Sequence, residues 1–379
     1  MKARYLALSI LGALLVAAAG FAVWLATLPE NIDATAPLVP EAETAAMLDA
    51  LAPATSERPV IAVVGLNDAT ETTDYLYPTG VLRRANVADV FMLATAPGPV
   101  QLYPALKVVP DATVAQFDDD YPDGADYVIV PAMSRDDDPV VLDWLRQQAE
   151  KGAMIIGVCA GAKVVAAAGL LEGKLATTHW YYLKDLLNRD STIKYVPDRR
   201  FVMDDDVVTT TGISASMPMM LTLIEAIAGR DRTNAMAREI GIDRWDARHA
   251  SSAFRFTRDF ASGVLANTAA FWNREDLGIA LAPGMDELAL AMGADAWSRT
   301  YRSRVVSFAA DAEIVTRGGI RVLADRQVAD WPEAGLVPVY PDQPVAHALD
   351  KTLAAIARRY GEGTTDIVTM QLEYPRAVP

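Results

Sequence analysis

The chain has 379 residues, of which 52% are hydrophobic and 22% charged, a composition typical of a folded protein with more than one domain. Its formal net charge is −15. We predict no nucleic acid partner, because so acidic a surface repels phosphate backbones and the sequence contains no basic run. The single cysteine, Cys159, excludes an intramolecular disulfide and thiolate-rich zinc sites. We therefore predict no metal site and no cofactor.

The N-terminus has the pattern of a membrane anchor. Lys2 and Arg4 precede an uncharged stretch, residues 5–28, which is long enough to cross the roughly 30 Å hydrocarbon core as a helix. Acidic residues follow it, so the positive-inside rule places the globular part outside the cytoplasm, on the periplasmic side. We predict a signal anchor over residues 1–29 and a tether over 30–57 with one short helix at 43–51. A signal peptide cleaved near residues 17–19 is the alternative.

Strands alternate with helices between residues 58 and 230, which we predict to form one domain. The expected strands are 60–65, 90–94, 127–131, 153–158 and 207–211. The expected helices are 74–85, 139–151, 159–168 and 217–228. Continuous apolar strands that alternate with helices are typical of an α/β fold, a doubly wound parallel sheet with helices on both faces.

The C-terminal part, residues 231–379, repeats some of this order and is predicted to be a second α/β domain. Its expected strands are 277–282, 304–308, 336–340 and 366–371, and its expected helices are 286–299 and 346–360. We interpret it as a degenerate half-repeat of the first domain, without a cysteine after its last strand. Chance similarity between two βαβ units is the alternative. Such a half-repeat would build a pseudo-dimer within one chain.

Cys159 follows the buried strand 153–158 directly and opens the next helix. Its neighbours Gly157, Ala160 and Gly161 are small, as a sharp strand-to-helix turn requires. A nucleophile in such an elbow lies at a helix N-terminus, where we expect the pKa of the thiol to be lowered. Backbone N–H groups of the same turn could hold an oxyanion. The alternative is a buried structural cysteine.

Three motifs resemble the ThiJ/PfpI family of the class I glutamine-amidotransferase-like superfamily. They are Gly-Val-Cys-Ala-Gly-Ala at 157–162, Ala-Thr-Thr-His-Trp at 176–180 and Thr-Thr-Thr-Gly-Ile-Ser-Ala-Ser at 209–216. The motifs are similar to those of the amidotransferase-like domains of AraC-type regulators and of isonitrile hydratases. The resemblance covers roughly residues 58–230. It implies a flavodoxin-like fold, often dimeric, with a cysteine at the nucleophile elbow.

The resemblance also implies roles for individual residues. Cys159 matches the nucleophile, and Asp74, four residues before Pro78, matches the acidic partner of the thiol, with Glu71 as the alternate. His179 matches the family histidine, as a general base, a group that orients substrate or a histidine at a subunit contact. Ala160, Ala132, Met133 and Trp180 are expected to line the oxyanion and substrate pocket. At Ala132 and Met133 the chain departs from the family's Pro-Gly-Gly, which puts a glyoxalase-type activity in doubt.

The functional prediction is a membrane-anchored, cysteine-dependent hydratase or hydrolase that acts on a small electrophilic substrate. The alternatives are a non-catalytic ligand-binding or regulatory module and a thiol-based stress-protective protein. The expected partners are a small-molecule substrate or ligand and the membrane, through the N-terminal helix. The oligomeric state is left as a homodimer or an intrachain pseudo-dimer.

Overall fold

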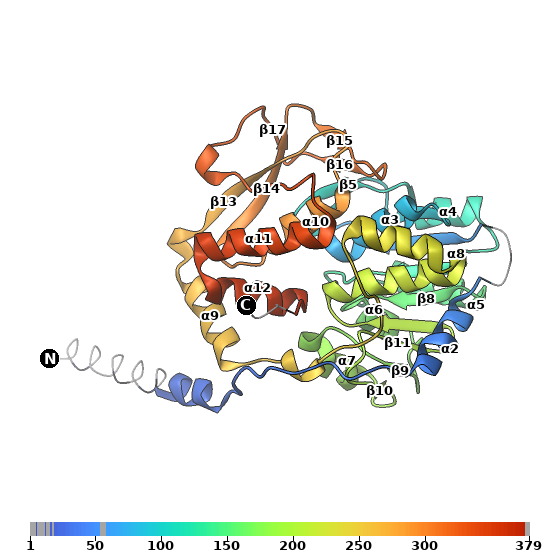
Figure 1. Ribbon diagram of the computed structural model, residues 1–379, viewed down its shortest axis with the longest axis horizontal. Coiled ribbons are helices and arrows are strands. Elements are labelled where there is room, and N and C mark those ends of the chain that lie inside the picture. The colour runs from blue at the N-terminus through green and yellow to red at the C-terminus, as the bar shows by residue number, and fades with distance from the viewer. Residues whose placement is uncertain (1–4, 6–11, 13–15, 17–18, 54–57, 376–379) are drawn as a thin grey trace.

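A seven-stranded sheet forms the centre of the first domain in the computed structural model, which describes residues 19–53 and 58–375 together with Tyr5, Gly12 and Val16. The strand order is β11-β12-β8-β7-β1-β3-β6. Every neighbouring pair is parallel except β11 and β12. This is the predicted α/β architecture, with helices on both sides of the sheet (Figure 1).

The bounds of the elements in this part of the chain are as follows. The strands are β1 Val60–Gly65, β2 Thr70–Glu71, β3 Asp89–Ala94, β4 Val100–Tyr103, β5 Lys107–Val109, β6 Ala112–Thr113, β7 Tyr127–Val130, β8 Met154–Gly157, β9 Leu175–Ala176, β10 Lys194–Tyr195, β11 Phe201–Asp204 and β12 Val207–Thr210. The helices are α2 Glu41–Leu51, α3 Thr72–Ala85, α4 Val114–Asp120, α5 Pro139–Glu150, α6 Gly161–Ala167, α7 Leu183–Arg189 and α8 Ser216–Ile240. Helix α8 breaks at Gly229 (φ 80°), where the sequence predicted its end.

Alternate residues of the buried strands face two different cores. Ile61 and Val63 of β1 belong to the core under α3 and α8, whereas Ala62 and Val64 belong to the core under α4, α5 and α6. Successive side chains of a strand point to opposite faces, so a sheet covered on both sides needs a continuous apolar run. The predicted strands were recognisable for this reason.

The C-terminal part adds one three-stranded sheet, two strands of a second sheet and four longer helices. Its strands are β13 Glu275–Ala280, β14 Ser303–Ala309, β15 Glu313–Val315, β16 Arg321–Leu323 and β17 Arg326–Gln327. Its helices are α9 Arg258–Ala269, α10 Glu287–Ser298, α11 Val345–Tyr360 and α12 Glu362–Leu372. Strand β16 pairs with β5 of the first domain, so one five-stranded sheet contains strands from both parts of the chain.

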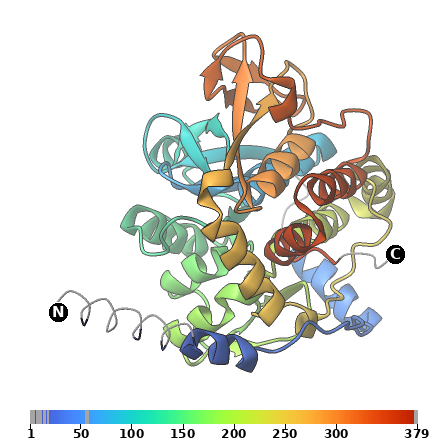
Figure 2. The ribbon, with the colours of Figure 1, turned by 90° about the vertical axis from the view of Figure 1, so that its left-hand side faces the viewer.

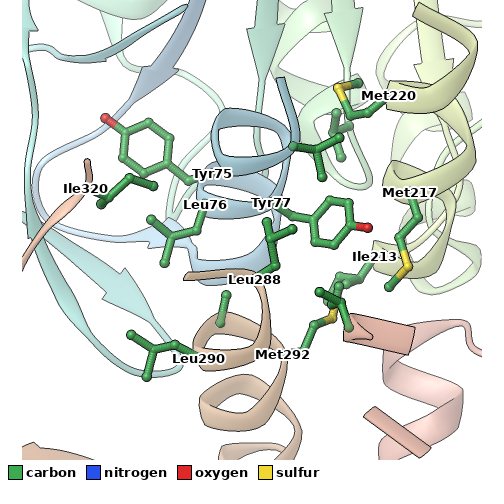
Figure 3. Close-up of a cluster of buried hydrophobic side chains, with 14 of the residues drawn as sticks. Tyr75, Leu76, Tyr77, Ile213, Met217, Met220, Leu288, Leu290, Met292 and Ile320 are labelled. Atoms are coloured by element: carbon green, nitrogen blue, oxygen red, sulfur yellow. The ribbon is translucent and has the colours of Figure 1, made fainter. Parts of the chain in front are cut away.

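Helices α3 and α10 pack against each other and join the two parts. Figure 3 shows Leu76 and Tyr77 of α3 close to Leu288 of α10, with Met217 and Met220 of α8 on the Tyr77 side. Tyr75 of α3 lies on another side of the helix, beside Ile320, and Leu290 and Met292 of α10 belong to the same cluster. These side chains belong to one hydrophobic cluster and are at most 4% exposed. The start of α10 approaches α3 at Gly80, where an added Cβ would lie 2.7 Å from Leu288.

Two predicted C-terminal strands differ from the structure. Residues 366–371 belong to helix α12, and the predicted strand 336–340 is reduced to a single parallel bridge between Leu336 and Gly278. The run Ile367-Val368-Thr369 suggested a strand, but tertiary packing overrides local propensity: Ile367, Val368 and Leu372 are buried on one face of α12. Within the described part of the chain, the sheet of the C-terminal part therefore has no strand that corresponds to β8 of the first domain.

Most of the predicted anchor lies outside the described residues, as do residues 54–57 of the predicted tether. Residues 19–27 are helical, and α2 is the short helix predicted in the tether. In the part of the chain that the structure covers, no helix has both the length and the apolar character needed to cross a bilayer.

Candidate active site

Cys159 lies in a strained elbow between β8 and α6. Its φ is 57°, in the left-handed region that a residue with a Cβ rarely adopts. The turn is so tight that a Cβ added at Gly161 would lie 1.9 Å from the Val130 carbonyl oxygen. The small residues around Cys159 are therefore a steric requirement of the turn, as the sequence predicted.

Two threonines hold the elbow from neighbouring segments. The Cys159 N–H donates to Thr210 Oγ1 (3.1 Å), and Thr178 Oγ1 donates to the Cys159 carbonyl (2.9 Å). Thr178 comes from the motif at 176–180 and Thr210 from the motif at 209–216. The motifs that carry the family resemblance thus fix the backbone of Cys159, the predicted nucleophile.

The Asp74 carboxyl lies beside the thiol. Asp74 is fully buried at the start of α3, and its Oδ2 accepts a hydrogen bond from the Ala132 N–H (3.3 Å). Its Oδ1 meets no nitrogen or oxygen donor among the described residues and is available to the proton of Cys159. The predicted acid–thiol pair is therefore brought together. The Ala132 N–H, expected near an oxyanion, is instead used to hold the acid.

Glu71 is the N-cap of α3, and its side chain holds the backbone of Asp74. Its Oε2 accepts hydrogen bonds from the Asp74 N–H (2.6 Å) and from Thr73 Oγ1 (2.9 Å). Its Oε1 accepts a hydrogen bond from Arg299 Nη2 (2.6 Å), and Arg299 Nε donates to Asp295 Oδ1 (2.6 Å). Arg299 and Asp295 come from the end of α10. The C-terminal part thus supplies a cation to a cluster of three buried carboxyl groups.

Burial controls the protonation of this cluster. It raises the pKa of Asp74 to about 7, against the opposing effects of the Ala132 hydrogen bond and Arg299. Burial also raises the pKa of the Cys159 thiol well above its ordinary value, and the Asp74 and Glu71 carboxylates raise it further. The prediction of a lowered thiol pKa is wrong, because the loss of solvent and two nearby carboxylates outweigh the Ala160 N–H at the helix N-terminus.

His179 lines the same cavity but both of its ring nitrogens are engaged by backbone groups. Nδ1 accepts from the Tyr181 N–H (3.2 Å), and Nε2 lies 3.0 Å from the Gln371 carbonyl oxygen. A carbonyl oxygen can only accept, so Nε2 carries the proton and the ring is neutral. Burial also lowers the pKa of His179 below its usual range, which favours the neutral ring. This geometry fits a role for His179 in shaping the cavity better than it fits a role as a proton acceptor.

A cavity of about 850 Å³ opens above the thiol. Cys159, Ala160, Ala132, Met133, His179 and Trp180 all line it, as predicted, together with Glu71 and Arg299. The Trp180 indole N–H donates to the Met370 carbonyl (2.7 Å), which fixes the ring in the wall. Among the described residues, no group of three or more His, Cys, Asp or Glu side chains could hold a metal ion.

The match to known proteins falls on this part of the chain. The family model described as DJ-1/PfpI family matches residues 60–226. Residues 60–226 are a DJ-1/PfpI family domain. The predicted resemblance to this family, also called ThiJ/PfpI, is confirmed.

Individual relatives resemble the DJ-1/PfpI domain over different lengths. The isonitrile hydratase of Pseudomonas putida is 42% identical over 96 residues, which are 25% of this chain and only 40% of that protein. Protein dj-1beta of Drosophila melanogaster is 26% identical over 182 residues, 47% of this chain and 94% of that protein. The crystal structure of that Drosophila protein has a TM-score of 0.45 and 24% identity, and the match covers 50% of this chain and all of the other.

Several site residues were not predicted from the sequence. Asp295 and Arg299 lie outside the DJ-1/PfpI domain, more than 200 residues after Asp74 along the chain. The predicted half-repeat contained a usable signal, because it aligns Arg299 with Arg84 at the end of α3. Thr178 and Thr210 were inside the quoted motifs, but only the fold shows that they contact Cys159.

Proposed function

We propose that this chain is a membrane-anchored enzyme that adds water to an electrophilic carbon, with Cys159 as nucleophile and Asp74 as general acid and base. The observation that carries the proposal is the pairing of Cys159, which lines a large cavity and is strained at φ 57°, with the buried Asp74 carboxyl group of pKa about 7. Asp74 itself is not among the residues that line the cavity. Strain and a shifted pKa together are more typical of a reactive centre than of a structural cysteine.

The proposed reaction has two steps that use the same proton carrier. In the first, the Cys159 sulfur attacks the electrophilic carbon while the thiol proton passes to the Asp74 carboxylate, which gives it to the substrate's heteroatom or carbon. In the second, water adds to the remaining C=N bond of the carbon bound to sulfur: the oxygen bonds to the carbon, and Asp74 passes one water proton to the nitrogen. The C–OH group then loses its proton through Asp74 to the departing sulfur while the C=O bond forms and the carbon–sulfur bond breaks. The hydrated product leaves and the thiol is restored.

Arg299 and Glu71 support this proton transfer in the proposal. A carboxylate with a pKa of about 7 is half ionised near neutral pH, so it can accept the thiol proton and return it. The Arg299 cation lowers the pKa of both Asp74 and Cys159 and so limits the effect of burial. Glu71 fixes the Asp74 backbone. The names of the relatives, which include an isonitrile hydratase, favour isonitriles and related carbon electrophiles as the first compounds to test.

The test is turnover of a panel of isonitriles, nitriles and 2-oxoaldehydes by the full chain in lipid nanodiscs. We expect hydration of one class and a covalent adduct on Cys159 visible in the intact mass. Cys159→Ala should abolish turnover and Asp74→Asn should lower it by about 10²–10⁴-fold. The matched control is Asp143→Asn, an exposed acid paired with Arg146, which should retain activity. Ligand binding without turnover by any class would support a binding module instead.

We also propose that residues 5–28 anchor the chain and that the globular part lies outside the cytoplasm. The support is the uncharged stretch behind Lys2 and Arg4 and the acidic residues after it. In a bacterial host, the full chain should stay in the membrane pellet after alkaline carbonate washing. Protease added to spheroplasts should digest the globular part. Recovery in the soluble fraction, or protection from the protease, would contradict the anchor or its orientation respectively.

A further inference from the structure

The cavity above Cys159 has a polar inner end around the thiol and a group of apolar residues outside it, and Ser134, Arg135, Asp136 and Lys163 also line it. The inner end contains the thiol with Glu71, His179 and Arg299. We define the apolar entrance as six residues that line the outer part: Phe21, Trp24, Phe256, Phe260, Val264 and Leu265. A volume of about 850 Å³ is near the upper end of the roughly 300–1,000 Å³ typical of sites for drug-sized ligands. A substrate of two or three carbon atoms would leave most of this space unfilled.

Aromatic rings form a continuous wall from the entrance to the active site. The successive pairs and their centroid distances are Phe21–Trp24 5.4 Å, Trp24–Phe256 6.3 Å, Phe256–Phe260 5.7 Å, Phe260–Trp180 5.4 Å and Trp180–His179 5.6 Å. Such a wall presents apolar surface along its whole length and few hydrogen-bonding groups. It is suited to an alkyl chain and not to a polar one.

The N-terminal segment is fixed at the entrance by Arg258 at the start of α9. Arg258 Nε donates to the Leu25 carbonyl (3.2 Å) and its Nη2 to the Ala26 carbonyl (3.1 Å). Its backbone N–H donates to the Pro29 carbonyl (2.9 Å). Residues 19–27 and α9 accordingly lie side by side (Figure 2). The cation satisfies carbonyl groups at the C-terminal end of the helical segment, where it also suits the helix dipole.

The entrance is at the end of the uncharged stretch, residues 5–28. At 1.5 Å per helical residue, Phe21 and Trp24 lie within about 11 Å of the end of that stretch. Large apolar side chains remain exposed here: Trp24 is 44% and Leu265 47% exposed. An exposed tryptophan on an apolar helix is typical of a membrane–water interface. The cavity thus opens where an anchored chain would meet the bilayer surface.

We propose that the cavity takes an amphiphile from the bilayer, with its reactive head group at Cys159 and its alkyl chain along the apolar entrance. This inference rests on the proposed function for the chemistry at the head group. It adds the substrate class: an electrophilic carbon carried on a long alkyl chain. The anchor has a second role in this arrangement, because Phe21 and Trp24 form part of the binding site.

The test uses the single cysteine as a reporter of what enters the cavity. The full chain in phosphatidylcholine nanodiscs is treated with N-ethyl- or N-octyl-2-chloroacetamide, and the rate of Cys159 alkylation is read from the intact mass. We expect the octyl reagent to react at least about tenfold faster than the ethyl reagent. Leu265→Glu should reduce the ratio of the octyl rate to the ethyl rate to about 1. Since both proteins face the same bilayer, partition of the reagent into lipid cancels in this comparison.

Val140→Glu is the matched control, because Val140 is 46% exposed and does not line the cavity, and it should keep the octyl preference. Equal rates for both reagents, or a preference that survives Leu265→Glu, would overturn the proposal.

If neither reagent reaches the thiol, binding is tested with the unreactive ligand N-octylacetamide. This ligand should raise the melting temperature of the wild type but not that of Leu265→Glu. An unchanged melting temperature of the wild type would overturn the proposal. Turnover of the electrophile panel is measured on the same samples. A chain-length preference without turnover would contradict the proposed function alone.

Discussion

At the residue scale, the proposed chemistry depends on one proton between Cys159 and Asp74. Burial disfavours the charged form of either group, so both pKa values are raised and the thiol remains protonated in the resting site. An exposed thiolate at a helix N-terminus would react with any electrophile in the surroundings. A buried thiol beside a carboxylate gains nucleophilicity only when that carboxylate takes its proton. In the proposed mechanism, the proton transfer takes place at the buried inner end of the cavity.

The pH dependence of Cys159 alkylation tests this arrangement. Because Asp74 has a pKa of about 7, the carboxylate that accepts the thiol proton forms as the pH rises through 7. The alkylation rate of the wild type should therefore rise in a first step near pH 7 and again at high pH, where the thiol itself ionises. Asp74→Asn should lack the first step. It should also ionise its thiol at lower pH than the wild type does, because a neighbouring negative charge is removed.

The measurement is the rate of modification by iodoacetamide from pH 5 to 10, read by intact mass, with Asp143→Asn as the control. A single step near 8.5 in both the wild type and Asp74→Asn, as for an ordinary thiol, would show that the carboxyl group does not control the sulfur.

The sequence predicted that Cys159 and Asp74 lie together, but not the electrostatics of the pair. Cys159 could be found from the small residues around it, and Asp74 from its spacing to Pro78. Both patterns are local in the sequence, so neither residue needed a structure to be found. The direction of the thiol pKa could not, because it depends on burial and on Glu71, whose side chain the fold turns toward Asp74. Arg299 was out of reach for a similar reason: its contact with Glu71 joins residues 228 positions apart.

At the scale of elements, the elbow between β8 and α6 has the strictest steric requirement. Gly161 passes so close to Val130 that a single methyl group would collide with the backbone of β7. Gly161→Ala should therefore displace α6 and cost about 3 kcal/mol or more in the free energy of unfolding, with loss of Cys159 reactivity. The measurement is denaturant unfolding followed by circular dichroism.

Gly293→Ala is the control for this change. Gly293 lies within α10, and an added Cβ would meet nothing within 4 Å. Alanine is the better helix former, so this variant should be as stable as the wild type or more stable by up to about 1 kcal/mol. Equal stability of the two variants would contradict the tight approach at the elbow.

Elements of the C-terminal part correspond in order to those of the DJ-1/PfpI domain. Strand β13 (Glu275–Ala280) begins 215 residues after β1 (Val60–Gly65), and α10 begins 215 residues after α3. Asn86 and Tyr301, also 215 residues apart, both have left-handed backbones after their helices (φ 52° and 58°). The short strand β6 pairs in parallel with β3, and the short strand β17 pairs in parallel with β14. These correspondences support the half-repeat, which remains our proposal.

The ion pairs between α3 and α10 follow the same relationship. Arg84 near the end of α3 pairs with Asp286, the N-cap of α10, at 2.9 Å, and Arg299 at the end of α10 pairs with Glu71, the N-cap of α3, at 2.6 Å. Each helix thus supplies an arginine to the start of the other. In the proposed half-repeat, α10 lies where a second subunit would contact α3, and it supplies Arg299 to the site within one chain.

Removal of Arg299 should affect both stability and proton transfer. In Arg299→Met the buried carboxyl groups of Glu71 and Asp295 lose their cation, which should cost about 3–5 kcal/mol in the free energy of unfolding. Since Arg299 lowers the pKa of Asp74, the first step of Cys159 alkylation should move above pH 7. A purely structural role would not predict that shift.

The control for this prediction is Arg304→Met. Arg304 is 68% exposed in its pair with Asp276, so its loss should cost less than about 1 kcal/mol and leave the alkylation profile unchanged. An Arg299→Met variant whose alkylation profile matches the wild type would limit Arg299 to a structural role.

The whole molecule is held together by a core that crosses the limits of the DJ-1/PfpI domain. One hydrophobic cluster contains Val63 and Tyr75 from the matched region and Leu288, Val305 and Leu353 from the C-terminal part. The β5–β16 pairing joins the same two regions through backbone hydrogen bonds. The sequence suggested two domains from length and composition, but side chains that pack across the chain cannot be seen in it. The two parts should therefore unfold together.

A chain shortened to residues 1–241 tests this cooperativity, because it keeps the DJ-1/PfpI domain and loses α10. Its α3 would expose Leu76 and Tyr77, which are fully buried in the intact chain, and Glu71 would lose Arg299. Exposed apolar surface of this kind favours self-association. We expect the shortened chain to aggregate or to dimerise through α3, whereas the intact chain melts in one transition. Calorimetry and light scattering distinguish these outcomes. A monomeric shortened chain that melts at the parent temperature would show that the C-terminal part is dispensable for the fold and would argue against its place as a built-in second subunit.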